Sequence, residues 1–240
     1  MNYIYEPTSP HFHPRYAGPP PDDMTSEQRS LRQSILESRP RTGLSGPFGP
    51  WLAVPAIARP SQELGRTVRY ETSLSMRESE LVILLTGAKF KSEAEFDIHV
   101  GEARKAGVGW DVILSIPRGA LLSAEESAMQ QKGATVEFSL QNVKDRMIPL
   151  LAKEHDDGRA NRGSEDSCDN SKERELAVVL FTTELLDRNT VSDETYAATK
   201  KVLDGQDSVL VEITAIIGYY AYVAYTLNVF KIASAVETPK

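Results

Sequence analysis

Three polar side chains between Met76 and Gly107 have types and spacing suited to acid–base chemistry. Glu95 and His99 lie four residues apart, so they share one face of a helix. Apolar Phe96 beside them places His99 at the edge of a buried stripe. A carboxylate next to an imidazole orients the ring and raises its proton affinity, as general acid–base catalysis requires. Glu80, earlier in the chain, could complete a Glu–His–Glu relay.

Two helices joined by a short turn near residues 90–91 would position these side chains. The first begins at Met76 and has a broad apolar face. The second runs from Ser92 to Gly107, a glycine suited to a left-handed C-cap. At ~1.5 Å rise per residue, Glu80 and His99 lie within one turn of the same height on this antiparallel pair. The hairpin therefore allows the relay.

Simpler roles explain the same residues and stay open at this point. Ser92-Glu-Ala-Glu95 is a capping-box sequence, in which Glu95 returns to the Ser92 amide. Glu80 lies near the start of its helix, where a carboxylate favours the helix dipole. His99 could be a core histidine whose hydrogen bonds are satisfied.

The remaining pattern predicts an all-α fold with a single helical domain over residues 24–232. Glycines and prolines in 40–58 predict an irregular, extended path that packs across the bundle. Ser123 begins a capping-box sequence. The other predicted helices cover 24–38, 61–71, 110–116, about 133–153, 173–186, 191–204 and 207–232.

The last of these helices is long and apolar. Residues 209–229 contain one charge, Glu212, and are long enough to span a bilayer. However, tyrosines, threonines and Asn228 are spread through this stretch, and no positive cluster flanks it. We therefore expect no membrane partner. The pattern favours a helix buried on all sides in a bundle or an oligomer interface.

Three polar or proline-rich segments fall outside the predicted core. Residues 1–23 form a proline-rich arm, and 233–240 a C-terminal tail. His11 and His13 in the arm are interpreted as loop residues because no third metal ligand lies nearby. Residues 154–172 contain almost no hydrophobic side chains and predict a mobile insertion.

Composition restricts the class of protein further. The chain has 240 residues, a net charge of −7 and a pI near 5.3, which argues against a nucleic-acid partner. Cys168 is the single cysteine, so an internal disulfide, a Cys-x-x-Cys pair and a cysteine-based zinc site are excluded. The N-terminal residues have no signal-peptide pattern, which predicts a cytoplasmic protein.

The spacing of the polar residues resembles a family signature. The pattern is similar to that of the carboxymuconolactone decarboxylase and AhpD-like superfamily. It consists of Glu80, Ser92, Glu95 and His99, separated by eleven, two and three residues. Ser92 and Glu95 stand where the peroxidase branch of that superfamily has two cysteines. The chain therefore resembles the branch without the redox pair. The likeness covers roughly residues 38–120 and 173–232.

The resemblance implies an AhpD-like all-α bundle, assembled as a trimer or a dimer of trimers, with the site between helices near subunit contacts. It implies a lyase or isomerase that needs no cofactor or metal and acts on a small carboxylated or lactone-type ring. His99 would protonate the dienolate carbon left after CO₂ loss, or move a proton. Glu95 would orient His99, and Glu80 would complete the relay.

Four further residues are candidates for substrate binding. Hydrogen bonds to the substrate could come from Tyr219, Tyr220 and Asn228 on the long helix. Trp51 could cover the substrate with an apolar surface. Each is also suited to a structural role. The alternatives to the lyase are a non-catalytic helical oligomer or binding protein, and, less favoured, a peroxidase-type oxidoreductase that would have to use Cys168. A metal hydrolase is disfavoured by the resemblance to metal-free relatives.

Overall fold

The computed structural model describes residues 14–39, 43–119, 136–160 and 172–232, and within these ranges it is all-α with no strand. The predicted fold class is confirmed at this level. Several predictions lie outside the described residues: the roles of His11, His13 and Cys168, the helix beginning at Ser123, the tail 233–240, and most of the proline-rich arm and of the mobile insertion (residues 1–13 and 161–171).

The predicted helical hairpin is present at the centre of the molecule. It consists of α4 (Met76–Lys89) and α5 (Glu93–Lys105). Ser75 caps α4, and Gly107 adopts φ +87° directly after α5, as a left-handed C-cap requires. Every residue of α4 from Arg77 to Ala88 is buried, because α5, α10 and α12 surround it. The hairpin is therefore the core of the fold.

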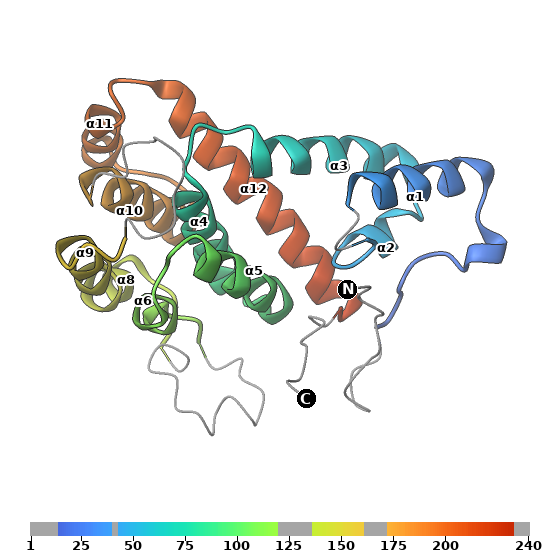
Figure 1. Cartoon of the computed structure of the whole chain (residues 1–240), viewed down its shortest axis with the longest axis horizontal. Coiled ribbons are helices and arrows are strands. Elements are labelled where there is room, and N and C mark those ends of the chain that lie inside the picture. Colours follow the sequence, from blue (N-terminus) through green and yellow to red (C-terminus); the bar gives the residue numbers. More distant parts are fainter. Residues whose placement is uncertain (1–13, 40–42, 120–135, 161–171, 233–240) are drawn as a thin grey trace.

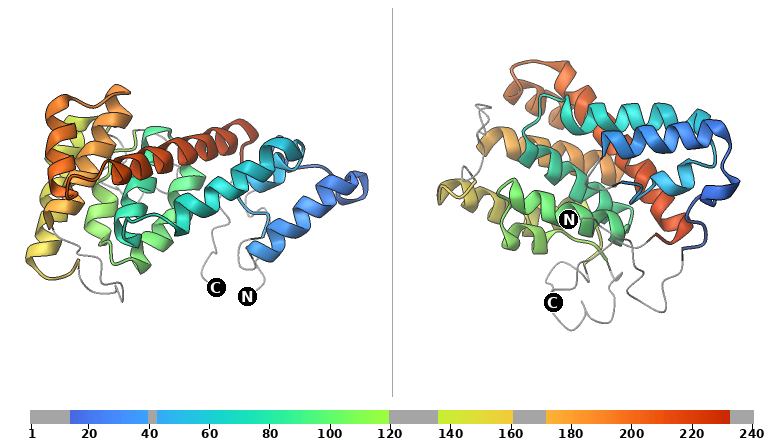
Figure 2. Two further views of the ribbon diagram at one scale, coloured as in Figure 1. Left: turned by 90° about the horizontal axis from the view of Figure 1, so that it is seen from above. Right: turned by 45° about the vertical axis from the view of Figure 1, so that its right-hand side comes forward.

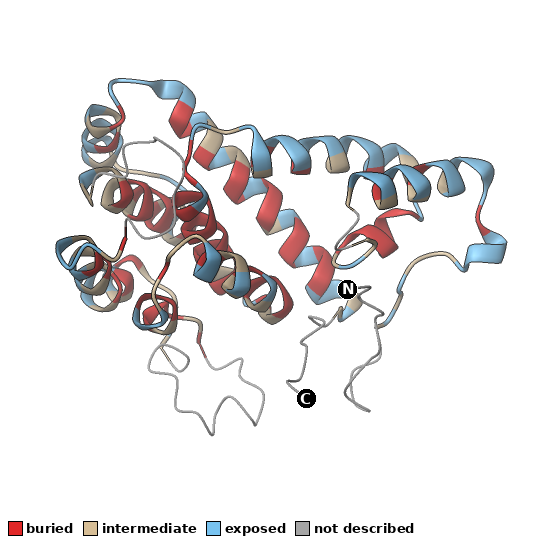
Figure 3. Ribbon diagram, in the orientation of Figure 1, coloured by how far each residue is buried: buried red, intermediate tan, exposed pale blue. Residues whose placement is uncertain are grey.

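The other helices form two groups on either side of the hairpin and α12 (Figures 1 and 2). Buried residues gather on α4, α10 and one side of α12, whereas α1 and α3 are largely exposed (Figure 3). One group contains the short 3-10 helix η1 (Pro21–Asp23), α1 (Ser26–Ser38), α2 (Phe48–Trp51) and α3 (Pro55–Tyr70). The other contains α6 (Trp110–Ser115), α8 (Leu140–Arg146), α9 (Ile148–Asp156), α10 (Lys172–Arg188) and α11 (Asp193–Val202).

The proline-rich segment is more helical than its composition predicted. Residues 48–51 form α2, and α3 begins at Pro55 rather than at residue 61. Pro55 occupies the first helical turn, where its fixed φ suits a helix and its missing N–H is not needed. Pro60 lies inside α3 and removes a single backbone bond.

The polar segment after residue 153 also differs from the prediction. The helix expected over 133–153 is two helices, α8 and α9, with Pro149 in the first turn of the second. Helix α9 continues to Asp156, and Glu154 is buried because it forms an ion pair with Arg77 at 2.8 Å. A long-range partner thus extends the helix into a stretch with few hydrophobic residues.

The long helix α12 (Asp207–Phe230) is not buried on all sides within one chain. By length and composition it could cross a membrane, and 56% of its apolar window is buried inside the fold. It packs against α3, α4, α5 and α10. Its remaining face is exposed, for example at Val211 and Tyr225. The single chain therefore buries one side of α12, and burial of the other side in an oligomer interface stays a prediction.

Candidate active site

The hairpin brings Glu80, Glu95 and His99 together. The Nδ1 atom of His99 lies 2.8 Å from a Glu80 carboxylate oxygen, a hydrogen bond between α5 and α4. The Nε2 atom lies 3.3 Å from Glu95 Oε1. His99 Nε2 and Glu95 Oε1 therefore lie within ion-pair distance, but Glu95 Oε1 makes no hydrogen bond. All three residues are buried, with whole-residue exposures of 0% for Glu80, 3% for Glu95 and 7% for His99.

A fourth residue, Arg69, completes the site and was missed by the sequence reasoning. It lies in the last turn of α3, and its guanidinium donates to the second oxygen of Glu80. Its other terminal nitrogen lies 3.8 Å from Glu102. The signal available in the sequence is the position of Arg69 next to inward-facing Val68. Only the turn between α3 and α4 places it over Glu80.

The capping-box role of Glu95 and the helix-dipole role of Glu80 do not describe the structure, whereas His99 is buried and bonded to Glu80, as a core histidine would also be. Ser92 is the N-cap residue of α5, but its side chain makes no capping hydrogen bond. Glu95 faces His99 instead of the Ser92 amide. Glu80 is fully buried and bonded on both oxygens, so it is not a surface carboxylate at a helix start.

Burial and charge act in opposite directions on the histidine. Burial alone would lower the pKa of His99, but the adjacent Glu80 carboxylate and its hydrogen bond, with a further contribution from Glu95, raise it to about 9. Burial alone would likewise raise the pKa of Glu80. The neighbouring His99 and Arg69 outweigh it and hold the pKa of Glu80 below its ordinary value. At neutral pH the site contains an imidazolium between carboxylates.

Aromatic rings from α12 and α2 form one wall beside the histidine. The ring of Tyr220 meets His99 edge to face, with centroids 5.1 Å apart. Tyr219 contacts Tyr220 at 5.3 Å, and Trp51 contacts Tyr219 at 6.3 Å. The indole N–H of Trp51 donates to the Thr226 hydroxyl at 3.1 Å. Of the residues predicted to bind substrate, only Tyr220 touches His99; Trp51 lies two rings away in the core.

The remaining two candidates have structural partners. Burial raises the pKa of Tyr219 to about 12, so its hydroxyl stays protonated. That hydroxyl packs against Gly65 of α3, where a Cβ atom would overlap it. Asn228 is exposed and donates to the Phe90 carbonyl at 2.9 Å. Asn228 therefore joins the end of α12 to the hairpin turn.

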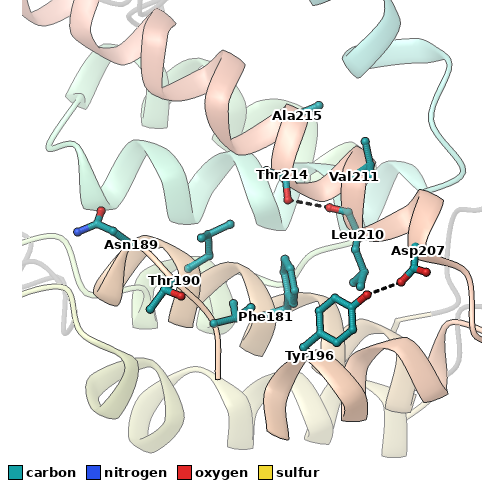
Figure 4. A pocket seen from close by; sticks show the side chains of 11 residues that line it. Phe181, Asn189, Thr190, Tyr196, Asp207, Leu210, Val211, Thr214 and Ala215 are labelled. Carbon is teal, nitrogen blue, oxygen red and sulfur yellow. Dashed lines mark hydrogen bonds between the residues drawn. The ribbon is translucent and has the colours of Figure 1, made fainter. Parts of the chain in front are cut away.

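The site is covered in the single chain. The His99 side chain is 9% exposed. A groove of about 650 Å³ lies between α10, α11 and α12 (Figure 4), and a small hollow of about 20 Å³ lies at the hairpin turn beside Ser92. Neither is lined by Glu80, Glu95 or His99. Among the described residues, no group of three or more His, Cys, Asp or Glu side chains has the arrangement to hold a metal ion.

A second buried network has the same residue types. Arg77 donates to Glu175 at 2.7 Å, to Glu154 at 2.8 Å and to the Gly107 carbonyl at 2.5 Å. His155 Nε2 lies 3.0 Å from Glu175. Burial alone would raise the pKa of Glu175, but His155 and Arg77 outweigh it and lower the pKa. This network joins α4 to α9 and α10.

Comparison with known proteins gives no relative. No protein-family model matches the chain, and neither curated proteins nor solved structures provide a match.

Proposed function

We propose that this chain is a cofactor-independent lyase or isomerase that transfers a proton to a small carboxylated or lactone-type ring, as its resemblance to the carboxymuconolactone decarboxylase-like family implies. The observation that carries the proposal is the buried series Arg69–Glu80–His99. It holds a histidine charged and fixed in orientation at a helix seam. The His99 network, as the set is called below, comprises Arg69, Glu80, Glu95 and His99.

The raised pKa makes His99 a proton donor in its resting state. With a pKa of about 9, the imidazole is protonated at neutral pH, so it acts first as an acid. The Nδ1–H is committed to Glu80, whereas the Nε2–H has no aligned acceptor. The Nε2 proton is thus the transferable one. This favours protonation of a carbanionic carbon over proton abstraction as the first act of His99.

The decarboxylation step balances with these groups alone. The bond between the ring carbon and the substrate carboxylate breaks, CO₂ leaves, and the electron pair stays on the ring as a dienolate. The dienolate carbon takes the Nε2 proton of His99. Neutral His99 then regains a proton from water, a step that the adjacent Glu80 and Glu95 carboxylates favour because they stabilise the imidazolium.

The partners of the histidine have distinct roles in this proposal. Glu80 fixes the ring through Nδ1, and Arg69 keeps Glu80 ionised at a buried position. Glu95 biases the Nε2 side toward the charged form. Tyr220 packs against the imidazole and supplies apolar cover.

A non-catalytic role is the second candidate, and one observation favours it. The network is covered in the single chain, and neither described hollow reaches it. In that case the same ion pairs would serve to join α3, α4 and α5 within a helical oligomer or binding protein.

Turnover of a panel of small γ-lactone carboxylates and β-keto acids, followed by CO₂ release, separates the two candidates. We expect His99→Gln to lower turnover by about 100-fold or more. The matched control is His155→Gln, which alters the histidine of the second buried network and should leave turnover within a few-fold. Equal losses in both variants, or no turnover by the wild-type chain, would support the non-catalytic role.

A further inference from the structure

We infer that the exposed face of α12 binds a second copy of this chain, with the two α12 helices antiparallel and crossing at Gly218. This inference is independent of the proposed chemistry, because it concerns a surface on the side of α12 that faces away from α4 and the His99 network.

The exposed face is apolar along most of the helix. Its residues recur every three or four positions, so they form one stripe. No charged side chain lies in the stripe, and the Thr214 hydroxyl is bonded to the Leu210 carbonyl of its own helix at 2.8 Å. The stripe, called the α12 face below, comprises Val211, Thr214, Ala215, Gly218, Ala221, Tyr222, Tyr225 and Val229, all exposed or half-buried.

The α12 face is symmetric about its central residue. Positions 211 and 225 lie seven residues on either side of Gly218, and 214 and 222 lie four residues on either side. A two-fold axis through Gly218 therefore superimposes the positions from 211 to 225 on themselves with the helix direction reversed, and it places Val229 opposite Asp207. A self-complementary patch of this kind is what an isologous contact between identical chains requires.

The two halves of the face are also complementary in shape. The N-terminal half borders the groove of about 650 Å³, lined mainly by apolar side chains that include Phe181, Leu185, Val211 and Ala215 (Figure 4). The C-terminal half presents the rings of Tyr222 and Tyr225. In the antiparallel arrangement the two rings of each copy lie over the groove of the other.

The rings are already held in place in the single chain. Tyr222 stacks on Trp51 with centroids 4.7 Å apart, and Tyr225 meets Phe90 edge to face at 5.0 Å. Little side-chain entropy is therefore lost when they enter a groove. Gly218 at the crossing point lets two backbones approach closely, and a Cβ there would meet nothing within 4 Å in the single chain.

Polar groups at the two ends of the helix have partners within the single chain. Asp207, at the N-terminal end of α12, forms an ion pair with Lys200 at 2.6 Å and accepts a hydrogen bond from the Tyr196 hydroxyl. At the C-terminal end, Arg15 donates to the Val229 carbonyl at 3.1 Å. The contact that we infer therefore rests on the apolar stripe, the rings and the groove between these two ends.

Sedimentation velocity across a concentration series tests the contact. We expect wild-type chain to self-associate and Gly218→Lys to weaken the association by about 100-fold or more, because a lysine at the crossing point would be buried without a partner. Gly101→Lys is the matched control: Gly101 is an exposed helical glycine of α5 with equally open surroundings. Both substitutions replace a poor helix former, so both variants should fold.

Cysteine cross-linking tests the direction of the helices. In a Cys168→Ser background, Gly218→Cys should form covalent dimers readily. Separate Val211→Cys and Tyr225→Cys chains, one carrying a size tag, should cross-link to each other in preference to themselves. Preferential self-cross-linking at 211 or 225 would contradict the antiparallel arrangement.

Two outcomes would overturn the inference: a wild-type chain that stays monomeric up to about 100 µM, and a Gly218→Lys variant that associates like wild type. A monomeric wild-type chain that also co-sediments with phosphatidylcholine vesicles would assign the face to a lipid surface.

Discussion

The His99 network and the Arg77 network (Arg77, Glu154, His155 and Glu175) are built from the same residue types and connected differently. Each has one arginine, two glutamates and one histidine, all buried or nearly so. In the Arg77 network the guanidinium is central, and it binds both carboxylates and a backbone carbonyl. In the His99 network the imidazole is central, between the two carboxylates.

The difference separates a structural role from a chemical one. A guanidinium stays protonated, so the Arg77 network has fixed charges and holds helices together. An imidazole can release its proton, and one side of His99 lacks an aligned acceptor. The arrangement of the same groups thus decides whether a buried proton is held permanently or can be transferred.

The largest expected effect concerns the arginines. Arg77→Met should lower the free energy of unfolding by about 3–5 kcal/mol, because it leaves the buried Glu154 carboxylate without its cation and leaves Glu175 with His155 alone. Arg69→Met should cost less, since Glu80 keeps its bond to His99 and Arg69 is 12% exposed. Urea unfolding of both variants measures the difference. A larger loss for Arg69→Met would reverse the comparison.

The pH dependence of stability should be carried by His99. Its folded pKa of about 9 exceeds the ordinary 6.5, so the stabilisation is fully present below pH 6.5 and is lost as pH rises through about 9. The shift corresponds to roughly 3 kcal/mol over that range. Urea unfolding between pH 6 and 10 measures this slope. We expect His99→Gln to remove it and His155→Gln to retain it.

A glycine allows the Arg77 network to be disturbed without changing a charge. A Cβ at Gly109 would overlap Glu154 Oε1, so Gly109→Ala should displace that carboxylate from Arg77 and cost about 1–3 kcal/mol. Gly101→Ala, at an open helical site, should be neutral or stabilise by up to about 1 kcal/mol. Thermal unfolding compares the two. Equal behaviour would mean that the Glu154 contact contributes little.

The smallest effect on stability is expected at Glu95. Its carboxylate lies near His99 without an aligned hydrogen bond, so Glu95→Gln should change the free energy of unfolding by less than about 1 kcal/mol. The same change should lower the pKa of His99, because one of the two carboxylates that raise it is neutralised. An NMR titration of the His99 ring protons measures the pKa. An unchanged pKa would show that Glu80 alone sets it.

Local rules were sufficient to predict the hairpin and its polar residues. Helical periodicity, Gly107 as a C-cap and equal heights across the turn placed Glu80 beside His99. They failed where a distant partner decides the conformation. Glu95 left the capping box because His99 lies within reach, and Arg69 reaches Glu80 only through the docking of α3.

Composition also failed to distinguish burial from exposure along α12. Apolar residues occur on every side of this helix, yet only one side is covered by α3, α4, α5 and α10. The sequence predicted that the bundle or an oligomer would bury this helix. In the single chain, the bundle buries one side of α12 and leaves the other side exposed. The choice depends on which helices dock against α12, which no local pattern specifies.

The hydrogen bond between Arg15 and the end of α12 has a consequence for the order of folding. The Arg15 side chain donates to the Val229 carbonyl at 3.1 Å, across 214 residues of chain, and its backbone N–H donates to the Phe230 carbonyl at 2.8 Å. A contact of such sequence separation closes a loop nearly as long as the chain, so we expect it to form late in folding. Arg15 borders the α12 face. We therefore expect that only fully folded chains complete the self-association. A partly folded chain in which Arg15 has not yet bonded to Val229 would lack the Arg15 end of the α12 face.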